Sequence, residues 1–453
     1  MEPARQIAEF VAQTDYTSIP SAALAAAKDA ILDSIGVALA GGREPAGRIP
    51  GDLAREEHAT EEATVLGQGF RSSATNAAFV NGTSTHALDF DASFPIMGQP
   101  MAGLPATVLA LAEATGANGQ QLLAGYVVGF EVAAKVAWAL PGAWSDSAWH
   151  SPATVGSVGC TAAAAKLLGL DLEQTAMAIG LVCSMASGVI GNFGTMGKPL
   201  HAGLGARNGV TAARLAQRGF TGNPLALNAT NGFFDAFVPS EAPDLEPIGN
   251  LGTKFDLAQG AVRFKAYPCG GLTHAAIDAV LALRTEHGLT ADTVDGIDVQ
   301  VSPFTASRII YRIPETGLQG KFSMPYILAR ALIDGRLTPD TFSDTATRDR
   351  AVLGLAERVH MEGSSELDHD ASGKRPARVS IRLKNGQILF RQVDYPKGSP
   401  EAPLTADELR SKFTVCAEPA LGPEAAGQAI SMLDRLDTVD SVARLAQLLA
   451  GPA

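Results

Sequence analysis

Side chains that could transfer protons occur in this sequence among glycines and other small residues, where the backbone can come close to a ligand. They are His86 and Asp89 in THALDFD, His150 in WHSPATVG, Lys198 and His201 in GKPLHAG, Lys265 in RFKAYPCGG, and Tyr326 in MPYILAR. Imidazole, carboxylate, phenol and amine groups are the usual general acids and bases of enzymes, and lysine adds a positive charge. Taken singly, each residue also fits a capped turn, a buried structural histidine or a solvated lysine. The residue types indicate acid–base chemistry without identifying a substrate.

The charge balance of the chain restricts the class of partner. The formal net charge is -12, and no run of Lys and Arg provides the basic footprint that nucleic acid requires. An acidic surface also repels anionic lipids, so we expect neither a nucleic-acid nor a membrane partner. If the substrate is a carboxylate, a few placed Lys, Arg or His side chains must make its pocket locally positive.

The motifs of cofactor sites are incomplete in this chain. The segment GNFGTMGKPLHAG has the wrong spacing for a phosphate loop and carries Pro199 where Ser or Thr is needed. In GLGARNG the third glycine is one position late for a dinucleotide fingerprint. His86, Asp89 and Asp91 could begin a metal site, but no further ligand is evident in the sequence. We therefore expect no metal and no cofactor.

The first half of the chain has the pattern of buried helices. Apolar residues recur at helical spacing over 21–40, with Ser21 as the expected N-cap and Gly41-Gly42 as the expected stop. Similar segments rich in Ala are 104–115, 121–140, 153–169, 174–189 and 202–218. These helices are apolar nearly all round, which indicates burial in a large helical body. Their small residues also suit close packing between subunits, so we expect a homodimer.

From about residue 255 the pattern changes to a mixture of strands and helices. A strand is predicted over 297–301, where Ile and Val alternate with polar residues. A β-hairpin is predicted over 379–390, because alternating segments flank Asn385-Gly386, a pair that favours a type I′ turn. Helices are expected at 274–287, at 324–334 and again within 404–450.

These patterns predict two domains, as the length of 453 residues also suggests. The fold class is mainly α, with a large, discontinuous, all-helical domain formed by 1–255 and 399–453. A smaller α+β domain is inserted over 256–398.

Neither a redox nor a membrane signal is evident. Cys160, Cys183, Cys269 and Cys416 are far apart and form no CxxC pair, which suits a reducing compartment. The N-terminus lacks a continuous apolar segment, and the most apolar stretches are interrupted by Gly or a charge within about 18 residues. We therefore expect a cytoplasmic protein.

Motifs along essentially the whole chain resemble those of the MmgE/PrpD family. In order they are NGTSTHALDFD, WHSPATVGSVGCTAAAAKLLGL, GNFGTMGKPLHAG, RFKAYPCGGLTHAAIDA and KFSMPYILARALIDG. Members of this family dehydrate, decarboxylate or epimerise small carboxylic acids. The resemblance implies a large helical domain, a smaller α+β lid domain, a homodimer and no cofactor.

The resemblance also assigns site residues by position. The family's pocket residues correspond to Asp89, Ser93, His150, Lys198, Lys265 and Tyr326, and His201 lies in the same motif as Lys198. We expect catalytic roles for Asp89, His150, Lys198, Lys265 and Tyr326, and substrate binding by His86, Ser93, Gln99 and His201. Gln99 and Gly270 stand where the decarboxylase branch has histidine, and Asp91-Ala92-Ser93 replaces the usual Asp-Asp-Thr. The loss of two imidazoles puts decarboxylation of cis-aconitate in doubt and favours a smaller substrate or one with fewer carboxylates.

The chemistry that the family shares is proton transfer next to a carboxylate, in which donors already in place meet the developing enolate-like charge. The first hypothesis is β-elimination of water from a hydroxy di- or tricarboxylate, with Lys198 and Lys265 as cations and Asp89, His150, Tyr326 or a lysine as base. The second is an epimerase, which exchanges a proton at one carbon with no leaving group. The third is a catalytically silent relative that binds a carboxylate. The sequence does not identify the substrate.

Overall fold

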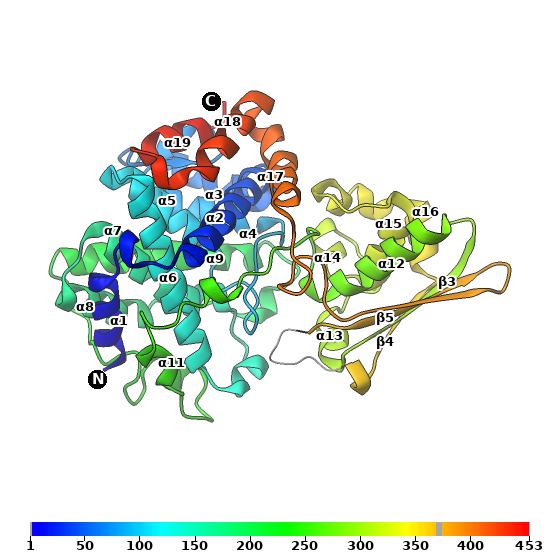
Figure 1. The fold of residues 1–453 in the computed structure, drawn as a ribbon, viewed down its shortest axis with the longest axis horizontal. Coiled ribbons are helices and arrows are strands. Elements are labelled where there is room, and N and C mark those ends of the chain that lie inside the picture. The colour runs from blue at the N-terminus through cyan, green and yellow to red at the C-terminus, as the bar shows by residue number, and fades with distance from the viewer. Residues whose placement is uncertain (1, 368–373, 453) are drawn as a thin grey trace. The chain divides into compact units, whose positions relative to one another are not determined.

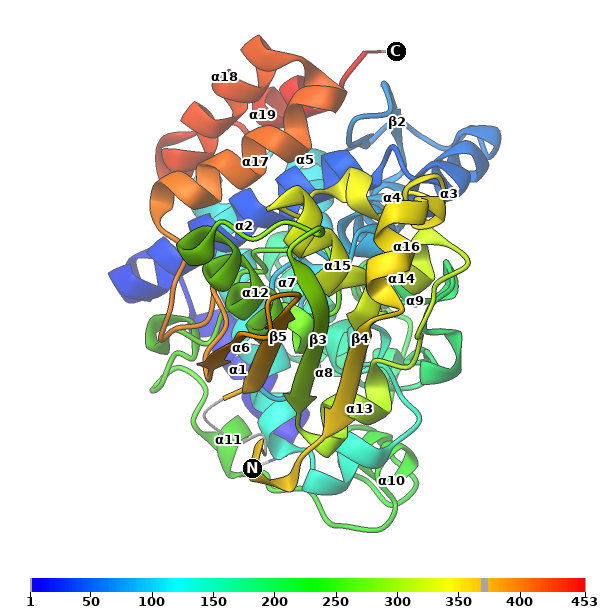
Figure 2. The same ribbon diagram turned by 90° about the vertical axis from the view of Figure 1, so that its right-hand side faces the viewer.

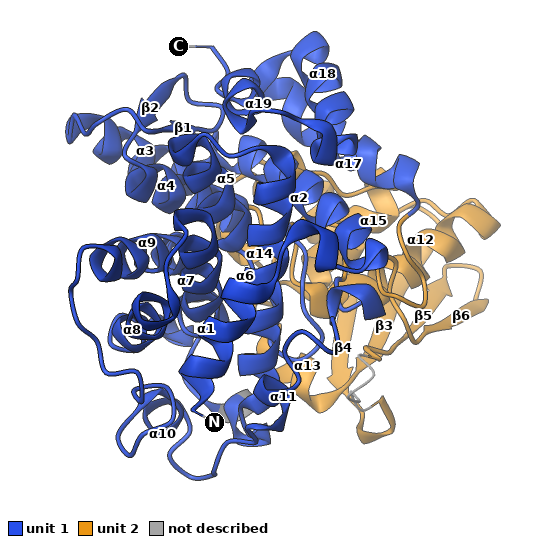
Figure 3. Ribbon diagram, turned by 60° about the vertical axis from the view of Figure 1, so that its left-hand side comes forward, with its two compact units in different colours: residues 1–87, 91–262, 405–453 blue, residues 88–90, 263–404 orange. Residues whose placement is uncertain are grey.

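The chain forms two compact units in a computed structural model that describes residues 2–367 and 374–452. Unit 1 comprises residues 1–87, 91–262 and 405–453, and unit 2 comprises residues 88–90 and 263–404 (Figure 3). The sequence placed the domain boundaries at 255/256 and 398/399, whereas the units change at 262/263 and 404/405. The short segment 88–90, which the sequence assigned to the helical domain, belongs to unit 2.

Unit 1 consists mainly of helices that cover one another. In chain order they are α1 (Pro3–Gln13), α2 (Ser21–Gly41), α3 (Pro45–Glu56), α4 (Ala74–Ala87), α5 (Leu104–Thr115), α6 (Gly119–Ala139), α7 (Val155–Leu168), α8 (Leu172–Cys183), α9 (Gly197–Gln217), α10 (Phe233–Phe237), α11 (Glu246–Gly249), α17 (Ala406–Leu421), α18 (Pro423–Asp434) and α19 (Val442–Leu449) (Figure 1). The helices predicted in this part are present. Ser21, the expected N-cap of α2, is instead its first residue, and Pro20 is the N-cap. Helices α6 and α7 are buried along nearly their whole length within unit 1. Their small residues therefore do not by themselves require a second copy, and the homodimer remains a prediction.

Two predicted helix ends need correction, and both lie beside the candidate site. The helix predicted over 174–189 ends at Cys183, and Gly188 has a left-handed φ of 98° that a helix does not accommodate. The helix predicted over 202–218 begins five residues earlier, at Gly197. Pro199 falls in its first turn, where the missing N–H of proline has no intrahelical acceptor to lose.

The expectation of an all-helical first domain is wrong in one detail. Unit 1 contains a short antiparallel pair, β1 (Ala63–Val65) and β2 (Phe70–Ser72). Three residues are too few for an alternating pattern to stand out in the sequence. Buried polar side chains hold β1 in place: Asn81 of α4 accepts from Leu66 N at 2.9 Å, and Glu113 of α5 accepts from Thr64 N at 2.7 Å.

Among the described residues, α6 is long and apolar enough to cross a membrane by length and composition. The sequence did not single it out, because Glu131 and Lys135 interrupt it. In its most apolar window, 94% of the residues are buried inside the structure, and a core helix passes the same test.

Helices α4 and α9 approach each other so closely that their contact requires glycine. A Cβ on Gly203 would lie 2.0 Å from Thr83 Oγ1 and 2.4 Å from the carbonyl oxygen of Phe79. A Cβ on Gly82 would lie 3.1 Å from the carbonyl oxygen of Ala202. Because the backbones come this close, the last turn of α4 lies beside the first turn of α9 within unit 1.

Unit 2 is an α+β structure with one sheet. Its four strands are ordered β4-β3-β5-β6, and β3 pairs with β4 in parallel and with β5 antiparallel. The strands are β3 (Val294–Val301), β4 (Val359–Gly363), β5 (Ala377–Leu383) and β6 (Ile388–Val393), and the helices are α12 (His274–His287), α13 (Pro303–Arg308), α14 (Gly317–Gly320), α15 (Met324–Asp334) and α16 (Arg350–Ala356). Helices α12 and α15 pack on one face of the sheet and share its apolar core (Figure 2). The predicted strand over 297–301 and the helices over 274–287 and 324–334 are confirmed.

The predicted hairpin is confirmed as β5 and β6, but its turn differs from the prediction. A type I′ turn needs positive φ at both central residues, and Asn385 is not among the residues with positive φ. Gly386 has a φ of 88°, and its N–H donates to the carbonyl of Leu383 at 2.9 Å. Asn385 Oδ1 accepts from Gln387 N at 3.0 Å instead. The loop is therefore a three-residue connection that ends in a left-handed glycine.

The close approach of α4 and α9 generates a stability prediction. Gly203→Ala should lower the free energy of unfolding by roughly 1–3 kcal/mol, because a backbone carbonyl cannot move aside as a side chain can. Denaturant titration measures this change. The matched control is Gly427→Ala in α18, where an added Cβ meets nothing within 4 Å. That variant should be roughly 0.5–1 kcal/mol more stable, because alanine favours a helix interior. Equal effects of the two substitutions would contradict the proposed role of Gly203.

Candidate functional site

The predicted site residues are divided between the two units. His86, Ser93, Gln99, His150, Lys198 and His201 belong to unit 1, and Asp89, Lys265 and Tyr326 belong to unit 2. All of them except Ser93 are buried. Within each unit, several of these side chains are in direct contact.

The Lys198 ammonium in unit 1 contacts an imidazole. Lys198 is in the first turn of α9, and its Nζ lies 3.0 Å from Nε2 of His86, in the last turn of α4. The other ring nitrogen, Nδ1, lies 3.0 Å and 3.1 Å from the two carboxylate oxygens of Asp91. Only 6% of Lys198 is exposed, which contradicts the alternative of a solvated surface lysine. An amine, an imidazole and a carboxylate therefore form one continuous buried chain of contacts.

The direction of these hydrogen bonds follows from the groups themselves. A carboxylate only accepts, so the His86 Nδ1 atom carries a proton that it donates to Asp91. In the neutral imidazole Nε2 is then an acceptor, and the Lys198 ammonium donates to it. Sequence reasoning considered Asp91 only as a metal ligand and missed this contact. The pattern His-x-x-x-x-Asp at the end of a helix was the available signal.

A second pair of imidazoles lies beside the first. His150, which precedes the 3-10 turn Ser151–Ala153, has its Nδ1 3.0 Å from Nδ1 of His201 in α9. The His150 and His86 ring centroids are 5.5 Å apart. The ring of Phe193 packs edge-on against His150 at 4.8 Å. Gly188 fits against His201, because a Cβ there would lie 3.1 Å from the imidazole.

Burial keeps one member of this pair neutral. The pKa of His201 is lowered from 6.5 to about 4, chiefly by desolvation and further by the nearby His86 and Lys198. His201 is therefore uncharged at neutral pH, and its contact with His150 needs a single N–H donor between two nitrogens. This arrangement suits hydrogen-bond donation or proton transfer by His150.

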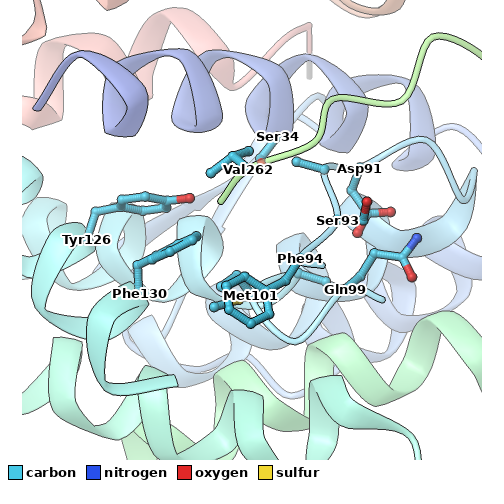
Figure 4. Close-up of a pocket in the computed structure, with 11 residues that line it drawn as sticks. Ser34, Asp91, Ser93, Phe94, Gln99, Met101, Tyr126, Phe130 and Val262 are labelled. Atoms are coloured by element: carbon cyan, nitrogen blue, oxygen red, sulfur yellow. The ribbon is translucent and has the colours of Figure 1, made fainter. Parts of the chain in front are cut away.

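A small cavity in unit 1 borders Asp91. It has a volume of about 20 Å³, which is room for roughly one water molecule. Asp91 and Gln99 lie at one end, and Tyr126 and Phe130 lie at the other (Figure 4). Ser93 also lines it. Gln99 and Ser93 therefore border a space too small for a di- or tricarboxylate.

In unit 2, two buried lysines hold the segment 88–90. Lys265 Nζ donates to the Asp89 carbonyl at 2.8 Å and lies 2.9 Å from the Asp89 carboxylate. Lys321 Nζ donates to the carbonyl of Leu88 at 2.7 Å and to that of Pro268 at 3.1 Å. Asp89 has a left-handed φ of 51°, which costs a non-glycine residue on the order of 1 kcal/mol. Sequence reasoning missed Lys321, although it heads the motif KFSMPYILARALIDG.

Tyr326 lies in the core of unit 2, and its catalytic role remains a prediction. Its side chain is fully buried in the apolar core of unit 2. The hydroxyl donates to the Thr341 carbonyl at 2.5 Å and accepts from Arg330 Nε at 3.2 Å. Burial raises the pKa of the phenol. Tyr326 therefore supports the fold of unit 2.

The candidate metal ligands have protein partners. His86 and Asp91 bind each other, the second nitrogen of His86 contacts Lys198, and Asp89 lies beside Lys265. A cation binding to His86 would have to displace the ammonium of Lys198 or the hydrogen bond to Asp91. These donors fit a proton-transfer chain better than a metal site.

The lowered pKa of His201 predicts a pH dependence of stability. Between pH 6.5 and 4 the unfolded chain binds a proton at this residue that the folded chain does not, so stability falls as the pH falls. The loss attributable to His201 should reach at most ~3 kcal/mol. Denaturant titrations at several pH values should give a shallower decline for His201→Asn than for the natural protein. The exposed His287 provides the control substitution, and an unchanged slope in His201→Asn would contradict the prediction.

Comparison with known proteins places the chain in a family. The model of the MmgE/PrpD N-terminal domain matches residues 5–246, and that of the MmgE/PrpD C-terminal domain matches residues 267–438. Cis-aconitate decarboxylase of Mus musculus is 30% identical over 441 residues, which cover 94% of this chain and 89% of that protein. The Homo sapiens enzyme is 28% identical over 94% of this chain and 90% of its own length. The 2-methylcitrate dehydratase of Salmonella typhimurium is 25% identical over 86% of this chain and 85% of its own length. This chain belongs to the MmgE/PrpD family.

Proposed function

We propose that this chain is a lyase that eliminates water from a small hydroxy di- or tricarboxylate by moving a proton at a carbon next to a carboxylate. The observation that carries the proposal is the buried contact of Lys198 with His86, beside the His150–His201 pair. Elimination needs a base for the carbon-bound proton and an acid for the leaving hydroxyl. Lys198 and His150 are our candidates for these two roles.

Electrostatics support a carboxylate substrate. The chain as a whole carries a formal net charge of -12, so an anion can bind only where cations are gathered locally. Lys198 places such a cation in a buried position, where charge acts more strongly than in water. The same ammonium can stabilise the enolate-like charge that develops when the proton leaves.

Decarboxylation is the second candidate. It is supported by the cis-aconitate decarboxylases, whose identity of 28–30% with this chain exceeds the 25% of the Salmonella typhimurium dehydratase. Two residues favour dehydration. The amide of Gln99 cannot transfer a proton as the histidine of the decarboxylase branch can. At Gly270, a Cβ would already lie 3.3 Å from the Lys321 carbonyl, so a histidine there would require its neighbours to shift.

The reaction type can be tested with 2-methylcitrate, citrate and cis-aconitate in D₂O, each followed by NMR. Formation of an alkene with loss of water supports the dehydratase. Release of CO₂ from cis-aconitate supports the decarboxylase, and deuterium entering unchanged acid supports an epimerase. Absence of turnover and exchange with a broad panel of di- and tricarboxylates would overturn the proposal of a lyase.

The role of Lys198 gives a direct mutational prediction. Lys198→Ala should abolish turnover while leaving the melting temperature nearly unchanged, and Lys198→Arg should not restore it, because a guanidinium does not give up its proton. Lys254→Ala, at an exposed lysine of the same unit, is the matched control. If Lys198→Ala keeps more than about a tenth of kcat/KM, less than ~1.4 kcal/mol was lost and Lys198 is not catalytic.

Metal removal provides a further prediction. Turnover should survive extensive dialysis against EDTA, because His86 and Asp91 are engaged with each other and with Lys198. The measurement is kcat/KM before dialysis, after dialysis, and after addition of Mg²⁺, Mn²⁺ or Zn²⁺. An enzyme that is inactive after dialysis and revived by one of these ions would contradict the expectation.

A further inference from the structure

We propose that His86 and Asp91 are positioning residues that convert Lys198 into a base by accepting its ammonium proton. The inference rests on the proposed function only in taking Lys198 as the group that acts on the substrate. It assigns to Asp91 a role in catalysis that its position in the sequence did not suggest.

The geometry permits the transfer in one step. Lys198 Nζ and His86 Nε2 are 3.0 Å apart, so the proton moves within an existing hydrogen bond. The bond from Nζ to hydrogen breaks and leaves its electron pair on Nζ, while a bond from Nε2 to hydrogen forms. Lys198 becomes a neutral amine and His86 becomes an imidazolium, so the charge of the pair is unchanged.

Asp91 favours this second state. Both of its carboxylate oxygens lie within 3.1 Å of His86 Nδ1, and the side chains of His86 and Asp91 are almost completely buried. In a buried setting a carboxylate stabilises a neighbouring imidazolium strongly. After the amine has taken a proton from the substrate, the pair holds one proton more than at the start. The leaving hydroxyl takes a proton from His150 and departs as water, and the extra proton of the pair replaces the one that His150 has given.

The other titratable groups around the pair fit the same scheme. The rings of His150 and His86 are 5.5 Å apart, and His201, which contacts His150, is neutral and does not compete for the proton. Asp33 of α2 lies near Asp91, but it is paired with Lys412 of α17 at 2.6 Å. Asp89, two residues before Asp91, is held by Lys265 within unit 2. Within unit 1, Asp91 contacts His86 Nδ1 through both of its carboxylate oxygens.

The position of Asp91 is fixed by its own surroundings. Asp33 of α2 lies near Asp91, and its ion pair with Lys412 at 2.6 Å holds Asp33 in place. The small cavity beside Asp91 leaves room for about one water molecule, so the carboxylate has little space to turn away from His86. These contacts are expected of a residue that must keep one orientation.

The proposal predicts a characteristic pH profile for Asp91→Asn. With 2-methylcitrate or whichever acid the natural enzyme turns over, kcat/KM should fall by at least about tenfold at pH 7, since positioned acid–base groups are worth about 10²–10⁴-fold. Activity should recover toward that of the natural enzyme as the pH approaches that at which Lys198 loses its proton to solvent. Asp91→Glu retains the carboxylate and should restore most of the activity at pH 7. Asp256→Asn removes another buried carboxylate paired with a lysine and should leave the shape of the profile unchanged.

A measurement that needs no substrate separates this proposal from the proposed function. ¹⁵N NMR of the imidazoles, with His86 assigned by His86→Gln, should show a proton on Nδ1 in the natural protein, and Asp91→Asn should alter that signal. A His86 whose Nδ1 carries no proton at neutral pH would overturn the proposal. A loss of activity in Asp91→Asn that is uniform at all pH values would overturn it as well, because it would indicate a purely structural role.

Discussion

A buried ammonium must have partners that compensate for the loss of water, and this constraint determines the structure around Lys198. The cost of burying an unpaired charge is far larger than the stability of a whole domain allows. One contact of the Lys198 ammonium is with the imidazole of His86, and the carboxylate of Asp91 lies on the other side of that ring. Through this contact a proton can move between the two side chains.

That contact depends on how closely two helices pack. His86 is in the last turn of α4 and Lys198 is in the first turn of α9, so their side chains meet only if the helices cross near these ends. Gly82 and Gly203 allow that crossing, since a Cβ on either would press against the opposite backbone. Helix packing and acid–base chemistry are therefore not independent. A substitution in the interior of the helix pair would change the distance between Nζ and Nε2 as well as stability.

The sequence predicted most helices of both units because their apolar periodicity is strong, and it predicted the candidate residues because they lie in glycine-rich motifs. The sequence was less informative where contacts between distant parts of the chain determine the structure. The start of α9 was placed five residues late, since Gly and Pro in GKPLHAG look like a loop until Pro199 is seen in a first turn. Nor did the motif that contains Tyr326 show that its hydroxyl donates to the Thr341 carbonyl in the core of unit 2. The contact between His86 and Lys198 joins residues 112 positions apart, which no local pattern reveals.

The same pair of groups could serve both reactions of the family. Dehydration begins with removal of a proton from carbon, and decarboxylation ends with addition of a proton to the carbanion that CO₂ leaves behind. A lysine and an imidazole that share one mobile proton can do either, depending on which partner holds it when the substrate binds. In the proposed scheme, the bond that breaks depends on how the substrate's carboxylates are oriented. It also depends on Gln99 and Gly270, which stand where the decarboxylase branch has histidine. The residues that bind the substrate would then determine which reaction occurs. The contacts from Asp91 through His86 to Lys198 supply the proton transfer that both reactions need.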